Sequence, residues 1–378
     1  IMLNNIYDAC PQAGIEEAGI VYEAPVEGGL TRLMGIFEDY RGMEKIGSVR
    51  SCRDYYIDFA KEFDAVYIHY GQAVYAMNKL NAEDTDNISG LQYQDQAGSV
   101  SGYCGEDIFY RTSDRPAPHN VYISEEGIKT AMERNGYRTD YEDDFTGHYK
   151  FAADDETIVP DEGTATVIRP GYSVNKPWFE YNAEAGYYNR FQYGEAQIDQ
   201  NTNDQLAVTN IIFQVCQWQN YDDHGYLNID TQSGGDMYYF TKGGYEKGTW
   251  KKEDPENPDS RAVYYDADGN ELKVTQGSYV PLLENPDRNV RKAAFESLHG
   301  TFQSFKNTSA AFLDGQIKQL IFYAKARRYN STLEAALAET EVPVSVYRNL
   351  IDAVNANLEY LHKYIALRKK LTGSEELH

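Results

Sequence analysis

Apolar positions in the first 150 or so residues follow two spacings, one typical of strands and the other of helices. Residues 31–38 and 65–70 are short apolar runs that favour strands. Residues 54–63 and 125–135 place their apolar side chains along one face of a helix. This mixture predicts a mixed α/β domain over residues 1–154.

From about Asp155 onward, short apolar and tyrosine-rich runs are separated by turn-forming residues. Asn, Asp and Gly in the separators favour tight turns between neighbouring antiparallel strands. The expected strand pairs are 179–181 with 188–193 around Gly186, 210–219 with 226–230 around 222–225, and 264–265 with 271–274 around 266–270. The pattern predicts an antiparallel β-rich domain of hairpins over residues 155–275.

Residues 277–378 carry local helix signals. These are a cap with a first-turn proline at Asn285-Pro286-Asp287, a capping box at Ser331-Thr332-Leu333-Glu334, and Pro343 at a third helix start. Apolar residues recur at helical spacing and predict buried stripes: Val290, Ala294, Leu298, Phe302 and Phe305, then Tyr347, Leu350, Val354, Leu358, Leu361, Ile365 and Leu371. The predicted fold class is therefore α+β, with a mixed α/β domain, a β-rich domain and a helical C-terminal segment.

Charge changes abruptly where the helical segment begins. The 378 residues have a net charge of −24, yet the part from Gly277 onward holds 13 Lys and Arg against 11 Asp and Glu. The preceding part is left with 22 Lys and Arg against 48 Asp and Glu, a net charge of −26. Such a step indicates a domain boundary near Gln276. The excess of acid excludes duplex nucleic acid and an anionic membrane surface as partners, because both would repel it.

The sequence holds no complete catalytic or metal-binding motif. Its four cysteines lack zinc spacing, and no two of its seven histidines form H-E-x-x-H. It contains neither a G-x-S-x-G elbow nor a Walker loop. No apolar run approaches the roughly 20 residues that span a bilayer. We therefore expect no catalytic residue, no metal, no cofactor and no direct insertion into a membrane.

Four arginines are the first candidate ligand-binding residues. Arg50 and Arg53 lie at the expected entrance to the 54–63 helix, where free backbone N–H groups also attract anions. Arg32 and Arg115 add two more guanidiniums, whose fork shape suits carboxylates and phosphates. They predict a pocket for a small anionic group, such as a peptide carboxylate or a cell-wall phosphate.

The alternative is that these arginines hold the domain together. The acidic side chains available to pair with them include Glu23, Glu27 and Asp58. Ion pairs of this kind would leave no guanidinium for a ligand.

Two histidines and an asparagine complete the candidate set. His69 follows an expected strand, and strand ends carry sites in α/β folds. His119 and Asn120 follow two prolines that stiffen their loop. Each histidine could act as a polar anchor or a base, and the alternative is a histidine whose ring is satisfied by the backbone.

Residues 1–275 resemble the YerB-like family of bacterial lipoproteins, whose function is not established. The segments that carry the resemblance include Pro11-Gln12-Ala13-Gly14, 20–29, 46–53, 64–69, Arg115-Pro116-Ala117-Pro118-His119-Asn120 and Tyr188-Asn189-Arg190. Cys52 and Ser48 depart from the family pattern. The resemblance implies two domains, mixed α/β and then β-rich, in a lipid-anchored extracytoplasmic protein.

Residues 277–378 resemble part of a second family, the helical region of oligoendopeptidase F, a zinc metallopeptidase. The segments concerned include Pro286-Asp287-Arg288, 291–296, 322–327, Leu333-Glu334-Ala335-Ala336-Leu337 and Val342-Pro343-Val344. The zinc-binding H-E-x-x-H helix of that family is absent from these residues, so the resemblance implies a non-catalytic segment and a cytoplasmic location.

The two resemblances indicate a composite chain with two functional alternatives. The first is an extracytoplasmic binding or scaffold module without enzymatic activity, whose ligand is a small anionic, peptide or cell-wall group. The second is a fragment of an oligoendopeptidase F-type metallopeptidase that lacks its zinc helix. The oligomeric state is left open.

Overall fold

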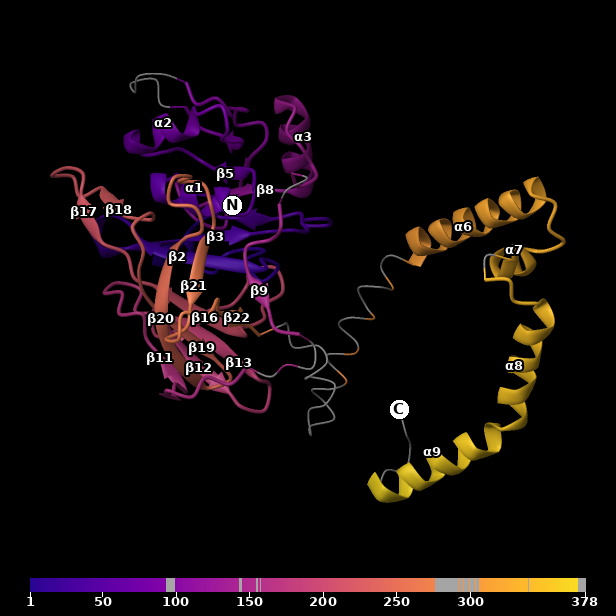
Figure 1. Cartoon of the computed structure of the whole chain (residues 1–378). Coiled ribbons are helices and arrows are strands. Elements are labelled where there is room, and N and C mark those ends of the chain that lie inside the picture. The colour runs from indigo at the N-terminus through magenta and orange to yellow at the C-terminus, as the bar shows by residue number, and fades with distance from the viewer. Residues whose placement is uncertain are drawn as a thin grey trace. The chain divides into compact units, whose positions relative to one another are not determined.

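The computed structural model describes residues 1–92, 99–142, 145–153, 156, 158–275, 292, 295, 299, 303, 306–338 and 340–372. The chain forms two compact units, Ile1–Arg291 and Lys292–His378 (Figure 1). The first unit combines strands with helices, and the second is helical in its described part. The predicted α+β fold class is confirmed. The predicted boundaries at 154/155 and near Gln276 fall on residues outside the described part of the chain.

The N-terminal half of the first unit contains three small sheets. Their strands are β1 (Met2–Asn4), β2 (Ile20–Pro25), β3 (Thr31–Ile36), β4 (Ile46–Gly47), β5 (Tyr67–His69), β6 (Asn87–Ser89), β7 (Tyr110–Arg111) and β8 (Val121–Ile123). The sheet orders are β1-β3-β2 and β4-β8-β7, both antiparallel, and a parallel pair β5-β6. In the first of these sheets β2 is an edge strand.

Helices pack beside these sheets. They are α1 (Asp54–Lys61), α2 (Met77–Leu80) and α3 (Glu125–Asn135), with 3-10 turns at Tyr7–Ala9, Glu27–Gly29 and Val74–Ala76. The side chain of Ser124 caps α3 by accepting a hydrogen bond from the Gly127 N–H, and Gly136 ends the helix with a φ of 69°. Helix α1 is buried on almost every side. The predicted strands at 31–38 and 65–70 and both predicted helices are confirmed as β3, β5, α1 and α3.

The C-terminal half of the first unit is built from short antiparallel strands. They are β10 (Gly163–Thr164), β11 (Val167–Ile168), β12 (Trp178–Asn182), β13 (Tyr187–Gln192), β14 (Glu195–Ala196), β15 (Ala207–Val208), β16 (Asn210–Gln214), β17 (Trp218–Asn220), β18 (Leu227–Ile229), β19 (Gly235–Thr241), β20 (Gly244–Lys252) and β21 (Ala262–Tyr265). Two sheets have the orders β10-β20-β19-β16 and β11-β12-β13-β14. β21 joins the first at β20 and β15 joins the second at β13.

The predicted hairpins are correct to different degrees. β12 and β13 pair across the turn at Gly186, as expected. The expected strand 210–219 is wrong, because it divides into β16, which pairs with β19, and β17, which pairs with β18 across the turn at residues 222–225. The expected pair at 264–274 is reduced to a single bridge, since β22 (Lys273–Val274) instead pairs in parallel with β9 (Lys150–Phe151). Local turn chemistry locates turns but not the partners of distant strands.

A buried charge cluster joins the two halves of the first unit. Glu62, at the end of α1, receives hydrogen bonds of 2.6 Å from Lys252 of β20 and lies 2.6 Å from His148 Nε2. All three side chains are about 1% exposed. Burial opposes ionisation of Glu62, yet the hydrogen bonds and charges of His148 and Lys252 hold its pKa below the ordinary value.

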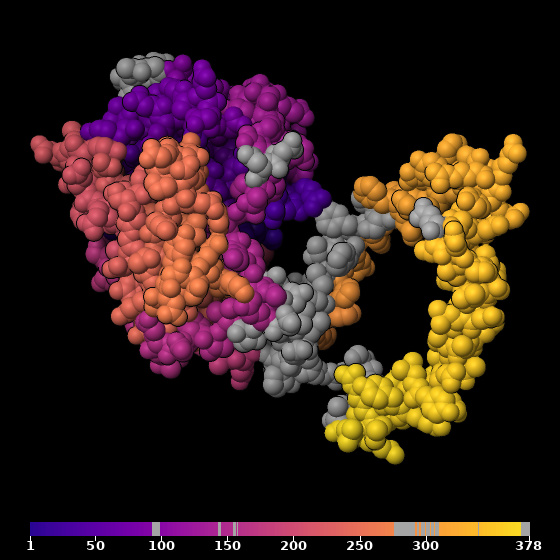
Figure 2. Space-filling model, in the orientation of Figure 1, coloured from indigo at the N-terminus to yellow at the C-terminus, as the bar shows by residue number. Residues whose placement is uncertain are grey.

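A second buried polar contact lies at β2. Glu23 forms an ion pair of 2.8 Å with Arg190 of β13 and accepts a 2.8 Å hydrogen bond from Asn175. Asn175 Nδ2 also lies 3.1 Å from Thr31 Oγ1. The two halves are thus fastened by charged and amide groups in addition to apolar packing. Figure 2 shows them as one continuous mass, coloured from indigo to orange.

The helical unit consists of α6 (Lys306–Ala326), α7 (Thr332–Ala338), α8 (Val344–Ala356) and α9 (Leu358–Thr372). The capping signals at Ser331 and Pro343 are confirmed: Ser331 Oγ accepts from the Glu334 N–H, and α8 begins directly after Pro343. The helix expected after Asn285 lies almost entirely outside the described residues.

The expectation of buried stripes in this unit is wrong for the helices that the structure describes. Ala324 is the one buried side chain among those whose exposure is described there. Leu350, Leu361 and Leu371 are exposed by 50% or more. Each described helix contacts its neighbour in the chain, and these contacts are too few to cover the apolar faces.

Candidate functional site

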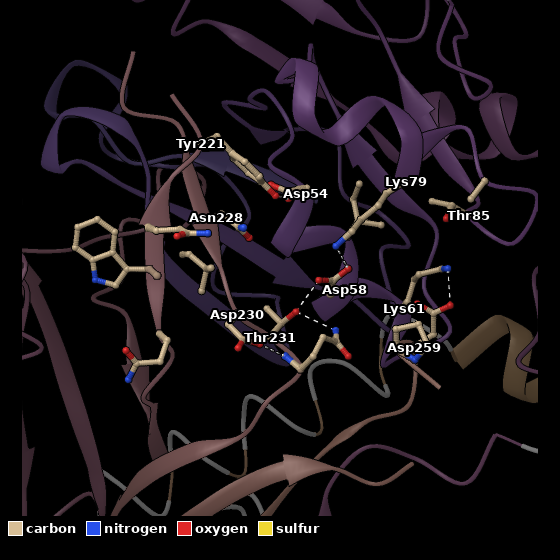
Figure 3. Close-up of a pocket in the computed structure, with 18 of the residues that line it drawn as sticks. Asp54, Asp58, Lys61, Lys79, Thr85, Tyr221, Asn228, Asp230, Thr231 and Asp259 are labelled. Carbon is tan, nitrogen blue, oxygen red and sulfur yellow. Dashed lines mark hydrogen bonds and ion pairs between the residues drawn. The ribbon is translucent and has the colours of Figure 1, made fainter. Parts of the chain in front are cut away.

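A pocket of about 720 Å³ lies between the two halves of the first unit. Helix α1 and the segment from α2 to Thr85 form one wall, the β17–β18 hairpin forms another, and Asp259 lies beside Lys61 (Figure 3). The polar and aromatic side chains that line it are Asp54, Asp58, Lys61, Lys79, Asp84, Thr85, Gln217, Trp218, Gln219, Tyr221, Asn228, Asp230, Thr231, Gln232 and Asp259. Its lining therefore combines carboxylates, amides and exposed rings.

The hairpin is held over α1 by its tyrosines. The Tyr221 hydroxyl donates a 2.6 Å hydrogen bond to Asp54 Oδ2, in the first turn of α1. The Tyr221 ring stacks on Tyr75 with centroids 4.1 Å apart, and the Tyr75 hydroxyl donates to Asp222 at 2.9 Å. Tyr226 meets the edge of the Tyr75 ring. These contacts fix the mouth of the pocket on the side of the hairpin.

Asp58 lies one turn after Asp54 on the same face of α1. It receives hydrogen bonds from Lys79 at 2.5 Å and from the Thr231 hydroxyl at 2.6 Å (Figure 3). Burial raises the pKa of Asp58, with Lys79 acting in the opposite direction. Asp58 thus links α1 to both α2 and the segment after β18.

Lys61 forms ion pairs with two of the carboxyl groups that line the pocket. Its amine lies 2.8 Å from Asp84 and 2.7 Å from Asp259. Burial disfavours the charged amine, but the bonds to these two carboxylates raise its pKa above the ordinary value. The hydrogen bond from Lys61 correspondingly lowers the pKa of Asp84.

Two side chains that line the pocket, Trp218 and Thr85, are in unusual environments. The Trp218 side chain is 63% exposed, although large apolar side chains usually avoid water. The Thr85 hydroxyl is buried and has no hydrogen-bond partner within the described residues. An unsatisfied buried hydroxyl costs free energy. Figure 3 places Thr85 on the same wall as Lys61.

None of the four predicted arginines lines this pocket. Arg53 is 7% exposed, pairs with Glu27 through two nitrogens, and covers the Tyr226 ring at 5.3 Å. Arg32 donates to the Ser51 carbonyl. Burial, followed by the charge of Arg53, lowers the pKa of Arg32 to about 10. The pairing with Glu27 is the alternative that the sequence analysis left open for Arg53.

The remaining predicted residues divide into two groups. Arg115 donates to the Ala9 and Pro11 carbonyls, and His119 Nδ1 lies 2.9 Å from Asn4 Nδ2. Partial burial lowers the pKa of His119, and the charges of Arg50 and Arg115 lower it further. Arg50 and Arg115 therefore each lie within electrostatic range of His119.

Asn120 and His69 lie away from solvent. Asn120 donates to the Thr112 carbonyl at 2.7 Å and accepts from Arg111 at 3.0 Å. His69 is fully buried, with Nδ1 2.8 Å from the Gly71 carbonyl oxygen, and burial lowers its pKa to about 4. It is a neutral core histidine without access to a ligand in this conformation.

A second cavity, of about 730 Å³, lies between the edge strands β2 and β16. Its lining is mainly apolar and includes Tyr22, Phe59, Ile211 and Tyr264.

In the described part of the chain, no group of three or more His, Cys, Asp or Glu side chains is arranged to hold a metal ion. None of the described helices is long and apolar enough to cross a bilayer.

Sequence reasoning missed the pocket because its residues come from both halves of the unit. The only local signal was the Asp54-x-x-x-Asp58 spacing, which puts two carboxylates on one face of α1. Trp218 lay inside a run that was assigned to a single long strand. Residues 84 and 259 are far apart in the sequence, and the fold brings both carboxyl groups to Lys61.

The fold and the pocket together define a two-part α+β protein whose halves enclose a polar, aromatic-lined cavity. The chain belongs to the DUF3048 family: residues 1–138 match the description "Protein of unknown function (DUF3048) N-terminal domain", and residues 166–280 match the C-terminal domain of the same family.

Two comparisons support this family. The chain is 30% identical to the "Putative lipoprotein YerB" of Bacillus subtilis over 256 residues, which is 67% of this chain and 72% of YerB. The crystal structure of the Bacillus subtilis YerB protein matches with a TM-score of 0.59 at 28% identity, covering 72% of this chain and 85% of that one.

The C-terminal part is similar to a different family. Residues 281–378 match "Peptidase family M3". Over 113 residues the chain is 44% identical to the "Oligopeptidase PepF" of Bacillus subtilis, which is 30% of this chain but only 17% of that peptidase. The predicted resemblances are confirmed, and the chain is composite.

Proposed function

We propose that the first unit is an extracytoplasmic binding module, without enzymatic activity, that holds a cell-envelope ligand in the pocket of Figure 3. The single observation that carries this proposal is the exposed Trp218 ring on the wall of a polar cavity. An exposed ring beside hydrogen-bonding side chains is typical of surfaces that bind ligands. The name of the relative, a putative lipoprotein, supports the location.

The pocket suits a ligand that is not an anion. Its lining holds five aspartates and two lysines, a net charge of −3 when all are ionised. Neutral amide side chains at Gln217, Gln219 and Asn228 add donors and acceptors on the β17–β18 wall. Cell-wall fragments that carry hydroxyl, amide and amino groups match this lining.

The test is a titration of the full chain with a soluble digest of bacterial cell wall, followed by calorimetry and tryptophan fluorescence. We expect binding by the natural sequence and about tenfold weaker binding by Trp218→Ala, since stacking on an aromatic ring contributes on the order of 1 kcal/mol or more. Tyr103→Ala is the matched control, because Tyr103 is exposed but does not line the pocket. Equal binding by Trp218→Ala would overturn the assignment of the site.

A second candidate function is recognition of an anionic group by Arg50, Arg115 and His119. The observation that favours it is that Arg50 and Arg115 both act on the His119 ring: after burial their charges lower the pKa of His119, while Asp8 acts in the opposite direction. The test is thermal unfolding with added inorganic phosphate. Stabilisation that is lost in Arg50→Ala and largely lost in Arg50→Lys would support an anion held by a guanidinium fork.

A further inference from the structure

We propose that the ligand of this pocket presents a primary ammonium group on an extended aliphatic chain, of the kind that a lysine-like residue of a wall peptide carries. This inference rests on the proposed function and names the ligand class for the same site. Three features of the pocket lead to it: unbalanced negative charge, an exposed indole and a buried hydroxyl without a partner.

The negative charge remains after the lysines of the pocket are accounted for. Lys79 pairs with Asp58, and Lys61 is shared by Asp84 and Asp259, so that end of the pocket holds one carboxyl group more than amines, with the Asp84 and Asp259 side chains also hydrogen-bonded to each other. The side chain of Asp54 accepts a hydrogen bond from the Tyr221 hydroxyl, which carries no charge. Asp230 Oδ1 accepts from backbone N–H groups of Gln232 and Ser233.

Carboxyl groups that no lysine of the pocket offsets therefore lie at Asp54, at Asp230 and at the end with Asp84 and Asp259. Hydrogen bonds from backbone and hydroxyl groups stabilise carboxylates in the ionised form, and the pKa of Asp230 is lowered by such bonds although burial acts against it. An approaching cation therefore meets carboxyl groups that already lie in place. An approaching carboxylate or phosphate meets repulsion from the same groups.

The Trp218 indole and the Thr85 hydroxyl offer further contacts to a lysine-like side chain. The face of a tryptophan attracts an ammonium group and packs against methylene groups, and the 63% exposure of Trp218 leaves its ring accessible. Ile229 supplies an apolar surface nearby on the pocket wall. Thr85 is 94% buried, and its hydroxyl has no hydrogen-bond partner among the residues that the structure describes, so a polar atom of a ligand would satisfy it.

A neutral sugar is the nearest alternative occupant. It would use the same indole and the amides of the hairpin, but it would leave the net charge of −3 without a counterpart. Since buried or partly buried charges are stable only when they are paired or well solvated, a cationic group satisfies the lining better than a sugar does.

The experiment compares two probes that differ only in charge. The full chain is titrated with Nα-acetyl-lysine methylamide and with the same compound acetylated on its side-chain nitrogen. We expect the ammonium probe to bind at least about tenfold more tightly, because a hydrogen bond to a charged group contributes about 1.5–3 kcal/mol. Its binding should weaken several-fold as salt is raised, since salt screens the carboxylates.

Matched variants locate the effect. Asp230→Asn should weaken the ammonium probe about fivefold or more, whereas Asp236→Asn, which removes an exposed charge outside the pocket, should leave binding unchanged. Trp218→Ala should weaken both probes. If Asp230→Asn binds the ammonium probe as tightly as the natural sequence and Asp236→Asn do, the assignment of charge recognition to this pocket is overturned.

The remaining outcomes separate this inference from the proposed function. Equal binding of both probes, or binding of an N-acetylglucosamine oligomer in place of the ammonium probe with loss in Trp218→Ala, would overturn the ammonium inference and leave the binding module intact. Absence of binding to either probe, to the oligomer and to the wall digest would overturn both.

Discussion

The hydroxyl of Tyr221 donates a 2.6 Å hydrogen bond to Oδ2 of Asp54, and this bond ties the loop between β17 and β18 to the first turn of α1. Asp54 is 6% exposed, so its carboxylate depends on this donor for part of its stabilisation. The bond crosses from the β-rich half of the first unit to its mixed half and closes one end of the pocket.

Replacing Tyr221 by Phe removes this donor but keeps the ring that stacks on Tyr75. We expect Tyr221→Phe to lower the free energy of unfolding by about 1.5–3 kcal/mol, because a nearly buried carboxylate loses a hydrogen bond. Tyr75→Phe is the control, since it removes a bond to Asp222 in an exposed turn and should cost less than about 1 kcal/mol. Urea titration measures both, and equal losses would contradict the role given to Asp54.

The buried cluster of Glu62, Lys252 and His148 should be essential for the joint between the halves. We expect Lys252→Met to destabilise the protein by about 3–5 kcal/mol, because the buried carboxylate of Glu62 loses its ammonium partner and keeps His148 alone beside it. The double variant Lys252→Met with Glu62→Gln should recover part of the loss. Urea titration of the three variants tests this, and a double variant as unstable as the sum of the single ones would contradict it.

Glu62 also predicts a response to acid. Its pKa is lower in the folded protein than in the unfolded chain, so its contribution to stability is fully present above the ordinary glutamate value of about 4.5. The contribution is lost as pH falls below that value through the folded pKa. The free energy of unfolding, measured from pH 6 down to pH 3, should fall more steeply for the natural sequence than for Glu62→Gln.

His69 gives a separate pH dependence at higher pH. Its folded pKa of about 4 lies below the ordinary value of 6.5, so the folded state binds fewer protons between these values. Stability is present above pH 6.5 and decreases as pH falls toward about 4, by about 3 kcal/mol at about 1.4 kcal/mol for each pKa unit. His69→Gln should flatten the curve between pH 6.5 and 4.5. An unchanged slope would contradict the picture of a neutral core histidine.

Local signals were sufficient to predict much of the fold. The apolar spacing of residues 125–135, Gly186 between β12 and β13, and the Ser331 capping box all act within a few residues, and the structure bears them out. Partners distant in sequence were not predictable in the same way. Strand β16 pairs with β19 rather than continuing into β17, and β22 pairs with β9, because sheet partners depend on long-range packing.

The candidate site shows the same limit in chemical terms. A guanidinium in the sequence could serve a ligand or an ion pair, and only the position of Glu27 reveals that Arg53 is already paired. Likewise, the exposure of Trp218 and the missing partner of the Thr85 hydroxyl depend on how two halves of the chain meet. Residue types therefore suggested the kind of chemistry, whereas the pocket required the fold.

Arg53 and Arg50 should respond differently to substitution. Arg53→Met leaves Glu27 without its guanidinium partner and uncovers the Tyr226 ring, so we expect a loss of about 2–4 kcal/mol in the free energy of unfolding. Arg50→Met should cost less, since its side chain is only partly buried. Chemical unfolding of the two variants measures the difference, and a larger loss for Arg50 would reverse the structural role given to Arg53.

The last prediction concerns the border between the two units. The described helices α6–α9 expose their apolar faces and, apart from Ala324, bury no side chain whose exposure is described. Segments with so little buried surface open readily and are cleaved before a packed core is. Brief treatment with a non-specific protease should therefore remove the helical part first and leave a stable fragment that ends near residues 270–285.

Because the cores of the first unit are formed by residues up to Val274, the fragment should keep its cooperative unfolding transition and the ligand binding of the full chain. Mass spectrometry of the fragment gives its end, and urea titration gives its stability. Cleavage within residues 1–260 at the same rate as within the helices, or loss of cooperative unfolding in the fragment, would mean that the first unit requires the helical part in order to fold.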